Sequence, residues 1–192
     1  MQREYLTEKS WLDRCTLPFP VHNFDTLRDL HPEDHAEVMI YGKLIPIPRF
    51  QRSYGQDYKF SGVVSKGHPI PDELRPFLDW TNSLGYGEYD EMLLNWYNGE
   101  SYIGSHKDSE SQLVPNSPIV TITLCLPGES RKFRIRDNNK KIVKDILTLN
   151  RSVLVMGGHF QKEFKHEIVK MTGKVALKAG KRISLTFRQF KK

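Results

Sequence analysis

The sequence predicts an α+β protein that is mostly β, built as an antiparallel sandwich or barrel with helices on one side. Five or more segments have the β-branched content or the strict alternation of strands, and they follow one another at close spacing. One helical segment precedes most of them. The 192 residues suit one domain, or one domain with an N-terminal extension, and 38% apolar residues are enough to bury a core.

The N-terminal third gives weaker signals than the rest of the chain. Residues 1–35 mix aromatics, acids and prolines without a clear period, so we expect an extension that packs on the body. Residues 38–41 are apolar and strand-like, and Gly42 follows them. Residues 44–56 are punctuated by proline and glycine and are predicted to be loop with brief extended pieces.

A helix is predicted over residues 70–84. Leu74, Phe77 and Leu78 are spaced as one apolar face of a helix. Pro76 lies within this pattern and implies a kink. The period then changes, and we expect strands over 92–97, 119–126, 132–136, 152–156 and 182–188.

The charge of the chain is strongly asymmetric, although the net charge is only +6. Residues 1–128 contain 11 Lys/Arg and 18 Asp/Glu, whereas residues 129–192 contain 18 Lys/Arg and 5 Asp/Glu. A positive field concentrated in one third of a domain attracts polyanions. Nucleic acid is therefore an expected partner, with an ordinary solvated surface as the alternative.

Several classes of protein are not expected. No apolar run approaches the roughly 18 residues of a membrane span, and the first residues lack the apolar stretch of a secretory signal. Two cysteines, Cys15 and Cys125, cannot form a disulfide framework. We expect an intracellular protein with no membrane partner, in the nucleus of a eukaryotic cell and otherwise in the cytoplasm.

The last predicted strand carries polar residues on one complete face. A period of two places apolar side chains on the opposite face. The polar face consists of Arg182, Ser184, Thr186 and Arg188. It either faces solvent, which is the commoner case, or lines a cavity, in which case the arginines require an anion such as a dicarboxylate.

A candidate metal site follows from three other residues. His106 and Asp108 form a His-x-Asp pair on an extended segment, which can present an imidazole and a carboxylate to one ion. His166 is the best third ligand, and His159 is the runner-up. Two histidines and one carboxylate are typical of non-haem Fe(II) sites with open positions, and zinc is the main alternative.

Several motifs occur together in one order. The chain carries Asn95-Trp96-Tyr97-Asn98-Gly99, then His106-Lys107-Asp108, and finally Arg182-Ile183-Ser184-Leu185-Thr186-Phe187-Arg188. Over residues 38–190 it resembles the AlkB family of Fe(II)/2-oxoglutarate-dependent dioxygenases, and most of all the AlkB homologues that repair duplex DNA. The resemblance implies a double-stranded β-helix, or jelly-roll, core with supporting helices. It also implies an N-terminal extension over 1–37 and a dioxygenase domain over 38–192, with a nucleotide-recognition lid over 38–66.

The resemblance implies a role for each matching residue. The iron ligands and catalytic centre would be His106, Asp108 and His166. The cosubstrate 2-oxoglutarate would be held by Asn95, Tyr97, Arg182, Ser184, Thr186 and Arg188, with Arg182 on its distal carboxylate and Ser184 where family members often have Asn. The damaged base would meet Arg49, Tyr58, Phe60, Ser61 and Glu110. Tyr41 would be a finger that fills the gap left by a flipped base.

The implied reaction is oxidative demethylation of N-alkylated DNA bases such as 1-methyladenine and 3-methylcytosine. It would release formaldehyde and convert 2-oxoglutarate and O₂ to succinate and CO₂, with Fe(II) as the metal. The enzyme is expected to act as a monomer on alkylated DNA. Three alternatives stay open: the same chemistry on RNA or single strands, a dioxygenase acting on a protein or small molecule, and a nucleic-acid binder without catalysis.

Overall fold

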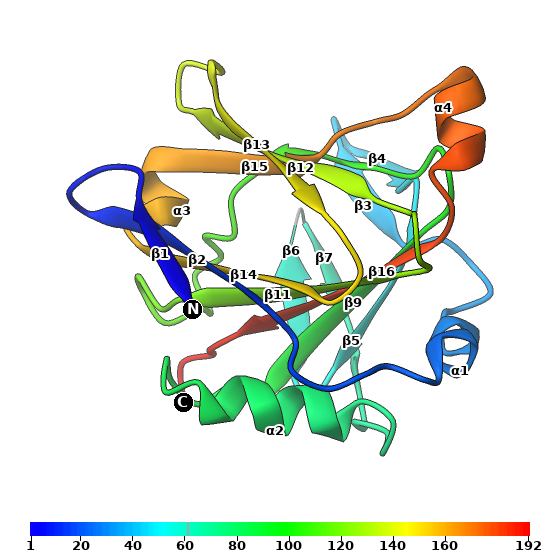
Figure 1. Ribbon diagram of the computed structural model, residues 1–192, viewed down its shortest axis with the longest axis horizontal. Helices are drawn as coiled ribbons and strands as arrows, with labels where there is room; N and C mark the ends of the chain where they lie inside the picture. Colours follow the sequence, from blue (N-terminus) through cyan, green and yellow to red (C-terminus); the bar gives the residue numbers. More distant parts are fainter. Residues whose placement is uncertain (61) are drawn as a thin grey trace.

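Two β-sheets packed face to face form the body of the protein (Figure 1). The structure is a computed structural model, and it describes residues 1–60 and 62–192. The larger sheet has eight strands in the order β1 (Gln2–Tyr5), β2 (Ser10–Thr16), β14 (Ser152–Gly158), β11 (Ile119–Cys125), β16 (Arg182–Arg188), β9 (Glu91–Tyr97), β5 (Phe50–Tyr54) and β8 (Gly67–His68).

The smaller sheet has four strands and lies across one part of the larger sheet. Its order is β10 (Ile103–His106), β15 (Phe164–Ile168), β12 (Arg131–Asp137) and β13 (Ile142–Thr148). All the pairings within it are antiparallel. The mostly β jelly-roll fold predicted from the sequence is confirmed.

Two hydrophobic clusters hold the layers together. Between the sheets lie Leu12, Ile119, Phe133, Ile135, Leu154, Met156, Phe160, Phe164 and Ile168. The opposite face of the larger sheet contributes Leu94, Trp96, Val120, Ile122, Val155, Ile183, Leu185 and Phe187 to a second cluster. Because β9, β11 and β16 are buried on both faces, polar residues on their inner face are held in the interior.

The helices are short and lie outside the sheets. They are α1 (Phe24–Asp29), α2 (Arg75–Ser83), α3 (Phe160–Glu163) and α4 (Gly173–Lys178). α2 covers the second cluster through the buried Phe77. The helix begins at Arg75 rather than residue 70, so Pro76 lies in the first turn, where no backbone donor is lost. The predicted kink is therefore wrong. Among the helices of the described residues, none is long and apolar enough to cross a membrane.

Two parts of the N-terminal third are more regular than the sequence suggests. β2 pairs with β14 along seven residues and so lies inside the larger sheet. β5 lies in the segment predicted to be loop with brief extended pieces, and it pairs with β9 over five residues. The sequence pattern predicts neither the place of β2 inside the larger sheet nor the pairing of β5 with β9. The division of the chain at residue 38 stays a prediction.

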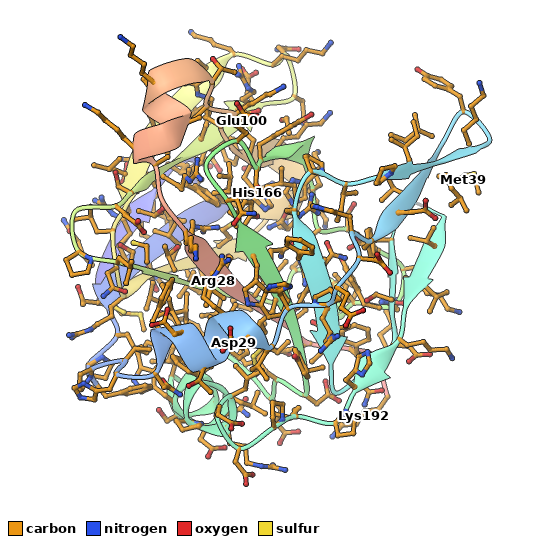
Figure 2. The ribbon with its side chains drawn as sticks, turned by 90° about the vertical axis from the view of Figure 1, so that its right-hand side faces the viewer. Arg28, Asp29, Met39, Glu100, His166 and Lys192 are labelled. Atoms are coloured by element: carbon orange, nitrogen blue, oxygen red, sulfur yellow. The ribbon has the colours of Figure 1, made fainter. Side chains whose placement is uncertain are left out.

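Two hairpins stand beside the larger sheet. One joins β3 (Glu37–Ile40) to β4 (Lys43–Pro46), and the other joins β6 (Tyr58–Phe60) to β7 (Val63–Ser65). Figure 2 shows the first hairpin, which carries Met39, extending away from the body. Apart from Glu37, both hairpins fall within the segment 38–66, whose role as a nucleotide-recognition lid stays a prediction.

Candidate active site

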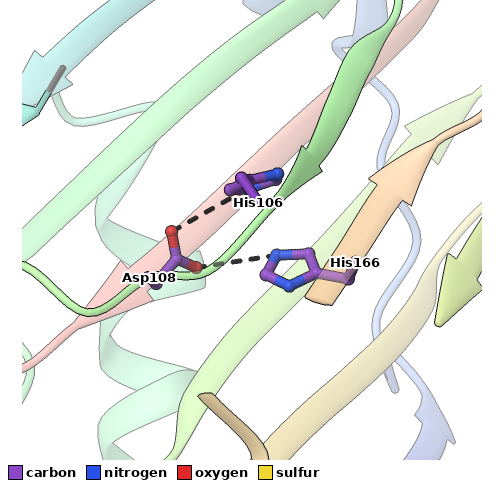
Figure 3. Close-up of side chains that lie close together, drawn as sticks. All are labelled: His106, Asp108 and His166. Carbon is purple, nitrogen blue, oxygen red and sulfur yellow. Dashed lines mark ion pairs between the residues drawn. The ribbon is translucent and has the colours of Figure 1, made fainter. Parts of the chain in front are cut away.

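The smaller sheet brings the three predicted metal ligands together. His106 at the end of β10 is directly opposite His166 on β15, and Asp108 follows two residues later (Figure 3). One donor atom from each side chain lies within 4.8 Å of the others. Nε2 of His106 is 3.9 Å from Oδ1 of Asp108, and Nε2 of His166 is 3.7 Å from Oδ2. This spacing allows one ion to contact all three.

Both histidines are neutral and suited to bind a metal. Burial lowers the pKa of His106, and it lowers the pKa of His166 to about 3. His106 Nδ1 lies 2.8 Å from the carbonyl oxygen of Gly104, which can only accept, so the proton is on Nδ1 and the Nε2 lone pair faces the cluster.

Asp108 supplies the negative charge of the cluster. Its burial alone would raise the pKa of the carboxyl group, but the charge and the hydrogen bond of Arg188 contribute to lowering it to about 2. Arg188 donates to Oδ1 at 3.0 Å, whereas Oδ2 is buried without a hydrogen-bond partner among the described residues. A buried, unpaired carboxylate oxygen between two neutral imidazoles fits a divalent cation.

An inner cavity extends from this cluster between the sheets. Arg182 lies in it, 2% exposed, and donates to Thr123 at 2.9 Å. Its Nε and Nη1 are buried without a partner among the described residues, and its guanidinium lies 4.9 Å from the centre of the Tyr97 ring. Unpaired donors on a buried guanidinium fit a carboxylate, such as the distal end of a diacid.

The inner cavity collects the polar residues predicted to hold the cosubstrate. All six of them line it: Asn95, Tyr97, Arg182, Ser184, Thr186 and Arg188. The polar face of the last strand is therefore buried around a cavity and does not face solvent. Ser184 lies 3.1 Å from the hydroxyl of Thr121, and the amide oxygen of Asn95 accepts a hydrogen bond from Arg49 at 2.7 Å.

An outer groove leads from the surface to the same cluster. It has a volume of about 490 Å³ and runs between the β3–β4 hairpin, β6 and the segment 102–110. Arg49, Tyr58, Phe60 and Glu110 all line it, together with His106. The rings of Tyr58 and Phe60 are stacked with centroids 5.3 Å apart. Ser61, the fifth residue predicted at the base, lies outside the described residues.

Tyr41 lies at the tip of the β3–β4 hairpin and is fully exposed. Ile40 pairs with Lys43, so Tyr41 and Gly42 form a two-residue turn with φ of 48° and 76°. Positive φ is natural for glycine but uncommon for tyrosine, and it costs about 1 kcal/mol or more. The hairpin thus holds an aromatic ring out in solvent at some energetic cost.

The structure also separates His159 from the site and adds residues that were not predicted. His159 precedes α3 and is not one of the clustered ligands. The side chain of Gln161 accepts from the backbone N–H of Asp108 at 3.0 Å. Thr121 and Thr123 alternate with apolar residues along β11, opposite Thr186 and Ser184. That alternation is visible in the sequence and could have predicted both threonines.

Comparison with known proteins agrees with this geometry. The model of the 2OG-Fe(II) oxygenase superfamily matches residues 7–188. The chain is 28% identical over 165 residues to human DNA oxidative demethylase ALKBH2, covering 80% of this chain and 61% of that protein. The bovine ALKBH2 is also 28% identical, over 167 residues, covering 80% of this chain and 57% of that protein. The chain thus spans about six tenths of these relatives.

Two further similarities are more distant. An RNA replication protein of Grapevine virus A is 25% identical over 153 residues, which cover 79% of this chain and 8% of that protein. A solved structure of OsALKBH1 superposes with a TM-score of 0.62 at 17% identity, covering 98% of this chain and all of that one. The latter similarity supports the fold alone.

The fold, the His-Asp-His cluster and the arginine-lined cavity are typical of the iron- and 2-oxoglutarate-dependent oxygenases. The chain belongs to the 2OG-Fe(II) oxygenase superfamily, and its similarity to the ALKBH2 proteins supports a place within the AlkB family. Its cofactors are Fe(II), 2-oxoglutarate and O₂, so the zinc alternative is not supported.

Proposed function

We propose that the protein removes alkyl groups oxidatively from ring nitrogens of DNA bases, 1-methyladenine and 3-methylcytosine being typical. The observation that carries this proposal is that the outer groove ends at His106 and Asp108 and is lined by aromatic and acidic side chains. A groove of about 490 Å³ has room for a single base. A base bound there would place its alkylated edge beside the metal.

The groove offers separate contacts for the faces and the edge of a base. Phe60 and the ring of His106 would lie on its two faces, since both line the groove. The carboxyl group of Glu110 would meet the base edge. One of its oxygens is buried without a partner among the described residues, and burial raises its pKa. A carboxyl group of this kind can accept a hydrogen bond from an exocyclic amine or, when protonated, donate one.

The exposed residues outside the outer groove would help to extract the base from a duplex. An alkyl group on the pairing edge weakens the base pair and lowers the flipping cost of a few kcal/mol. Tyr41, held out at the hairpin tip, would stack in the vacated space. Lys170, Lys174, Lys178 and Lys181 are all exposed and would contact phosphates.

The residues of the metal cluster and of the inner cavity would have separate roles in the reaction. His106, Asp108 and His166 would hold Fe(II), which would supply the oxidative chemistry: one atom of O₂ would enter the alkyl carbon as a hydroxyl group, and the other would enter succinate as 2-oxoglutarate loses CO₂. Arg182 binds the distal carboxylate of 2-oxoglutarate. Arg188 holds Asp108 in place, and the apolar walls of the inner cavity exclude water. The hydroxylated alkyl group leaves as formaldehyde and the base is restored.

The direct test is incubation with Fe(II), 2-oxoglutarate and an oligonucleotide that contains 1-methyladenine. We expect equal amounts of formaldehyde, succinate and repaired base. Omission of 2-oxoglutarate should abolish all three. Unchanged methylated base in the presence of rapid succinate formation would contradict the proposal and favour a protein or small-molecule substrate.

RNA is the second candidate substrate, favoured by the similarity to a viral RNA replication protein. Duplex DNA, single-stranded DNA and RNA with the same lesion should be compared side by side. We expect duplex DNA to be repaired at least as fast as the other two. A strong preference for RNA would assign the protein to RNA demethylation. Whichever nucleic acid it repairs, we propose that it acts as a monomer inside the cell, in the nucleus where the cell has one.

A further inference from the structure

A second buried arginine, Arg131, lies close to Arg182. Arg131 begins β12, is 1% exposed, and shares the inward face of that strand with Phe133, which lines the inner cavity. The residues assigned to the iron, the cosubstrate or the base do not include it. Burial of a guanidinium without an anion is costly, so we expect Arg131 to have a role that offsets this cost.

Arg131 donates to the sulfur of Met171 and to three backbone carbonyls at the ends of two other strands, and none of these acceptors is charged. Nη2 donates to the carbonyl oxygen of Asn98 at 2.5 Å and of Gly180 at 3.3 Å, and Nη1 donates to that of Gly99 at 2.7 Å. Asn98 directly follows Tyr97 at the end of β9, and Gly180 lies two residues before Arg182. Arg131 therefore joins the strand that carries Tyr97 to the strand that carries Arg182.

The close packing of this corner depends on the same segment. A side chain at Gly99 would collide with the backbone carbonyl of Ala176. The turn after β9 can thus lie against α4 only because it lacks a Cβ atom. Arg131 bonds to the carbonyl of that residue, so its guanidinium fixes a turn that has little room to shift.

Arg131 and Arg182 place two buried positive charges close together, and the charge of Glu129 offsets their repulsion only in part. Within residues 1–60 and 62–192, neither Arg131 nor Arg182 has a carboxylate within 4.0 Å. Arg188, by contrast, faces both Asp108 and Glu91. Burial lowers the pKa of Arg131, and the charge of Arg182 lowers it further. Two buried positive charges that repel each other are stabilised by an anion that arrives between or beside them.

We propose that Arg131 is a positioning residue for the distal carboxylate of the cosubstrate: it holds Arg182 and Tyr97 in register and adds a second positive charge close to Arg182. The proposal rests on the proposed function only for the use of 2-oxoglutarate. It explains why a guanidinium is buried at a corner where a neutral side chain could fill the same space. It also predicts that the site distinguishes a diacid from a monoacid partly through Arg131.

The test measures binding without turnover. The protein is loaded with Mn(II) in place of iron, and the affinities for 2-oxoglutarate and 2-oxobutanoate, which lacks the distal carboxylate, are determined by calorimetry. In Arg131→Met we expect affinity for 2-oxoglutarate to fall roughly tenfold, the effect of about 1.4 kcal/mol. Affinity for 2-oxobutanoate should change by less than about twofold.

Two further variants serve as controls for the comparison of 2-oxoglutarate with 2-oxobutanoate. Arg131→Lys keeps the charge but loses the paired donors of the guanidinium. We therefore expect its affinity for 2-oxoglutarate to lie between that of the wild type and that of Arg131→Met. Arg134→Met removes an arginine from the outward face of the same strand, where it pairs with Asp145, and should leave the ratio of the two affinities unchanged. If Arg131→Met does not fold, the ratio of the affinities for the two acids in Arg131→Lys alone tests the inference.

The outcomes separate this inference from the proposed function. An equal loss of affinity for both acids would show a merely structural role and overturn the inference, as would an unchanged ratio in a folded variant. A wild-type protein that binds 2-oxoglutarate but leaves methylated DNA unchanged would overturn the proposed function and leave the role of Arg131 intact. Steady-state data on an active enzyme should show the same effect in the KM for 2-oxoglutarate, with kcat nearly unchanged.

Discussion

Arg188 donates a hydrogen bond to Asp108 at 3.0 Å, and both side chains are buried. The guanidinium also faces Glu91, with Nη1 3.7 Å from the carboxylate, and lies over the ring of Tyr58. Arg188 is therefore held from three sides and can hold one oxygen of Asp108 in place. The other oxygen of Asp108 is left for the metal.

Replacing Arg188 by methionine should weaken metal binding. Asp108 would lose its only charge-assisted hydrogen bond among the described residues, and its carboxylate could rotate. Loss of a partner of this kind typically lowers metal affinity 10- to 100-fold, roughly. Titration with Mn(II) measures the change. Glu91→Gln is the comparison, because Glu91 contacts Arg188 but not Asp108, and it should cost much less. Equal effects of the two substitutions would contradict this view of Arg188.

Substitution of a metal ligand should abolish catalysis. His106→Ala, Asp108→Ala or His166→Ala removes one of three donors that lie within 4.8 Å of one another. We expect succinate formation to fall by at least roughly 100-fold, since the chemistry depends on the bound ion. His159→Ala is the matched control, because this histidine lies outside the cluster and should keep full activity. Full activity of a variant in the cluster would refute the metal assignment.

The buried histidines predict how the stability of the metal-free protein depends on pH. His166 has a pKa of about 3 when folded, against about 6.5 when unfolded. Its lowered pKa means that the unfolded state takes up a proton first as pH falls below about 6.5, so stability is lost from there down to about 3. The free energy of unfolding should fall by up to about 2 kcal/mol between pH 7 and pH 5.

Urea denaturation at these two pH values, in the presence of a chelator, measures the difference. His166→Gln should flatten the dependence, because glutamine does not titrate. Asp108 acts in a lower window. Its pKa of about 2 means that its contribution is complete above about 4 and is lost only in stronger acid. A wild-type stability that stays constant between pH 7 and pH 5 would contradict the burial of a neutral His166.

The sequence predicts the strands of the centre because they have strong periods. β16 alternates strictly, so its polar face is evident, but whether that face meets solvent or a cavity depends on the second sheet. The pairing of His106 with His166 depends on the register between β10 and β15, which join segments about 60 residues apart. The family resemblance links these residues; local pattern alone does not.

Three other features have no local signal in the sequence, and the reason in each case is physical. β2 mixes charged and apolar residues because Arg14 and Asp13 form ion pairs with β1, so its pattern has no clear period. β5 owes its strand conformation to β9 rather than to its own residues, which are polar and aromatic. Arg131 gives no local signal either, because its partners are backbone carbonyls of distant turns.

Tyr41→Ala should reduce repair of duplex DNA far more than repair of single strands. The exposed ring offers stacking energy only where a neighbouring base pair has been opened. Stacking of one base on an aromatic ring is worth about 1–3 kcal/mol, so a loss of roughly 5- to 150-fold on duplex is expected. Initial rates on the two substrates measure it. Tyr5→Ala removes another exposed tyrosine, on β1, and should change neither rate. A similar loss on both substrates would contradict the finger.

The exposed lysines near α4 should set the salt dependence of DNA binding. Lys170, Lys174, Lys178 and Lys181 lie in the basic last third of the chain. Each lysine that neutralises a phosphate of duplex DNA contributes about 0.9 to the slope of log affinity against log salt concentration. Changing all four to glutamine should therefore reduce the slope by between about 3 and 4 if all of them contact phosphates.

Fluorescence anisotropy over a range of salt concentrations measures this slope. The same variant should retain its affinity for 2-oxoglutarate, because none of the four lysines lines the inner cavity. Lys140, Lys141, Lys191 and Lys192 form a control set of equal charge elsewhere on the surface. Glutamine at those four positions should lower the slope less. If the two sets reduce it equally, DNA is attracted by the overall charge and not by a surface beside α4.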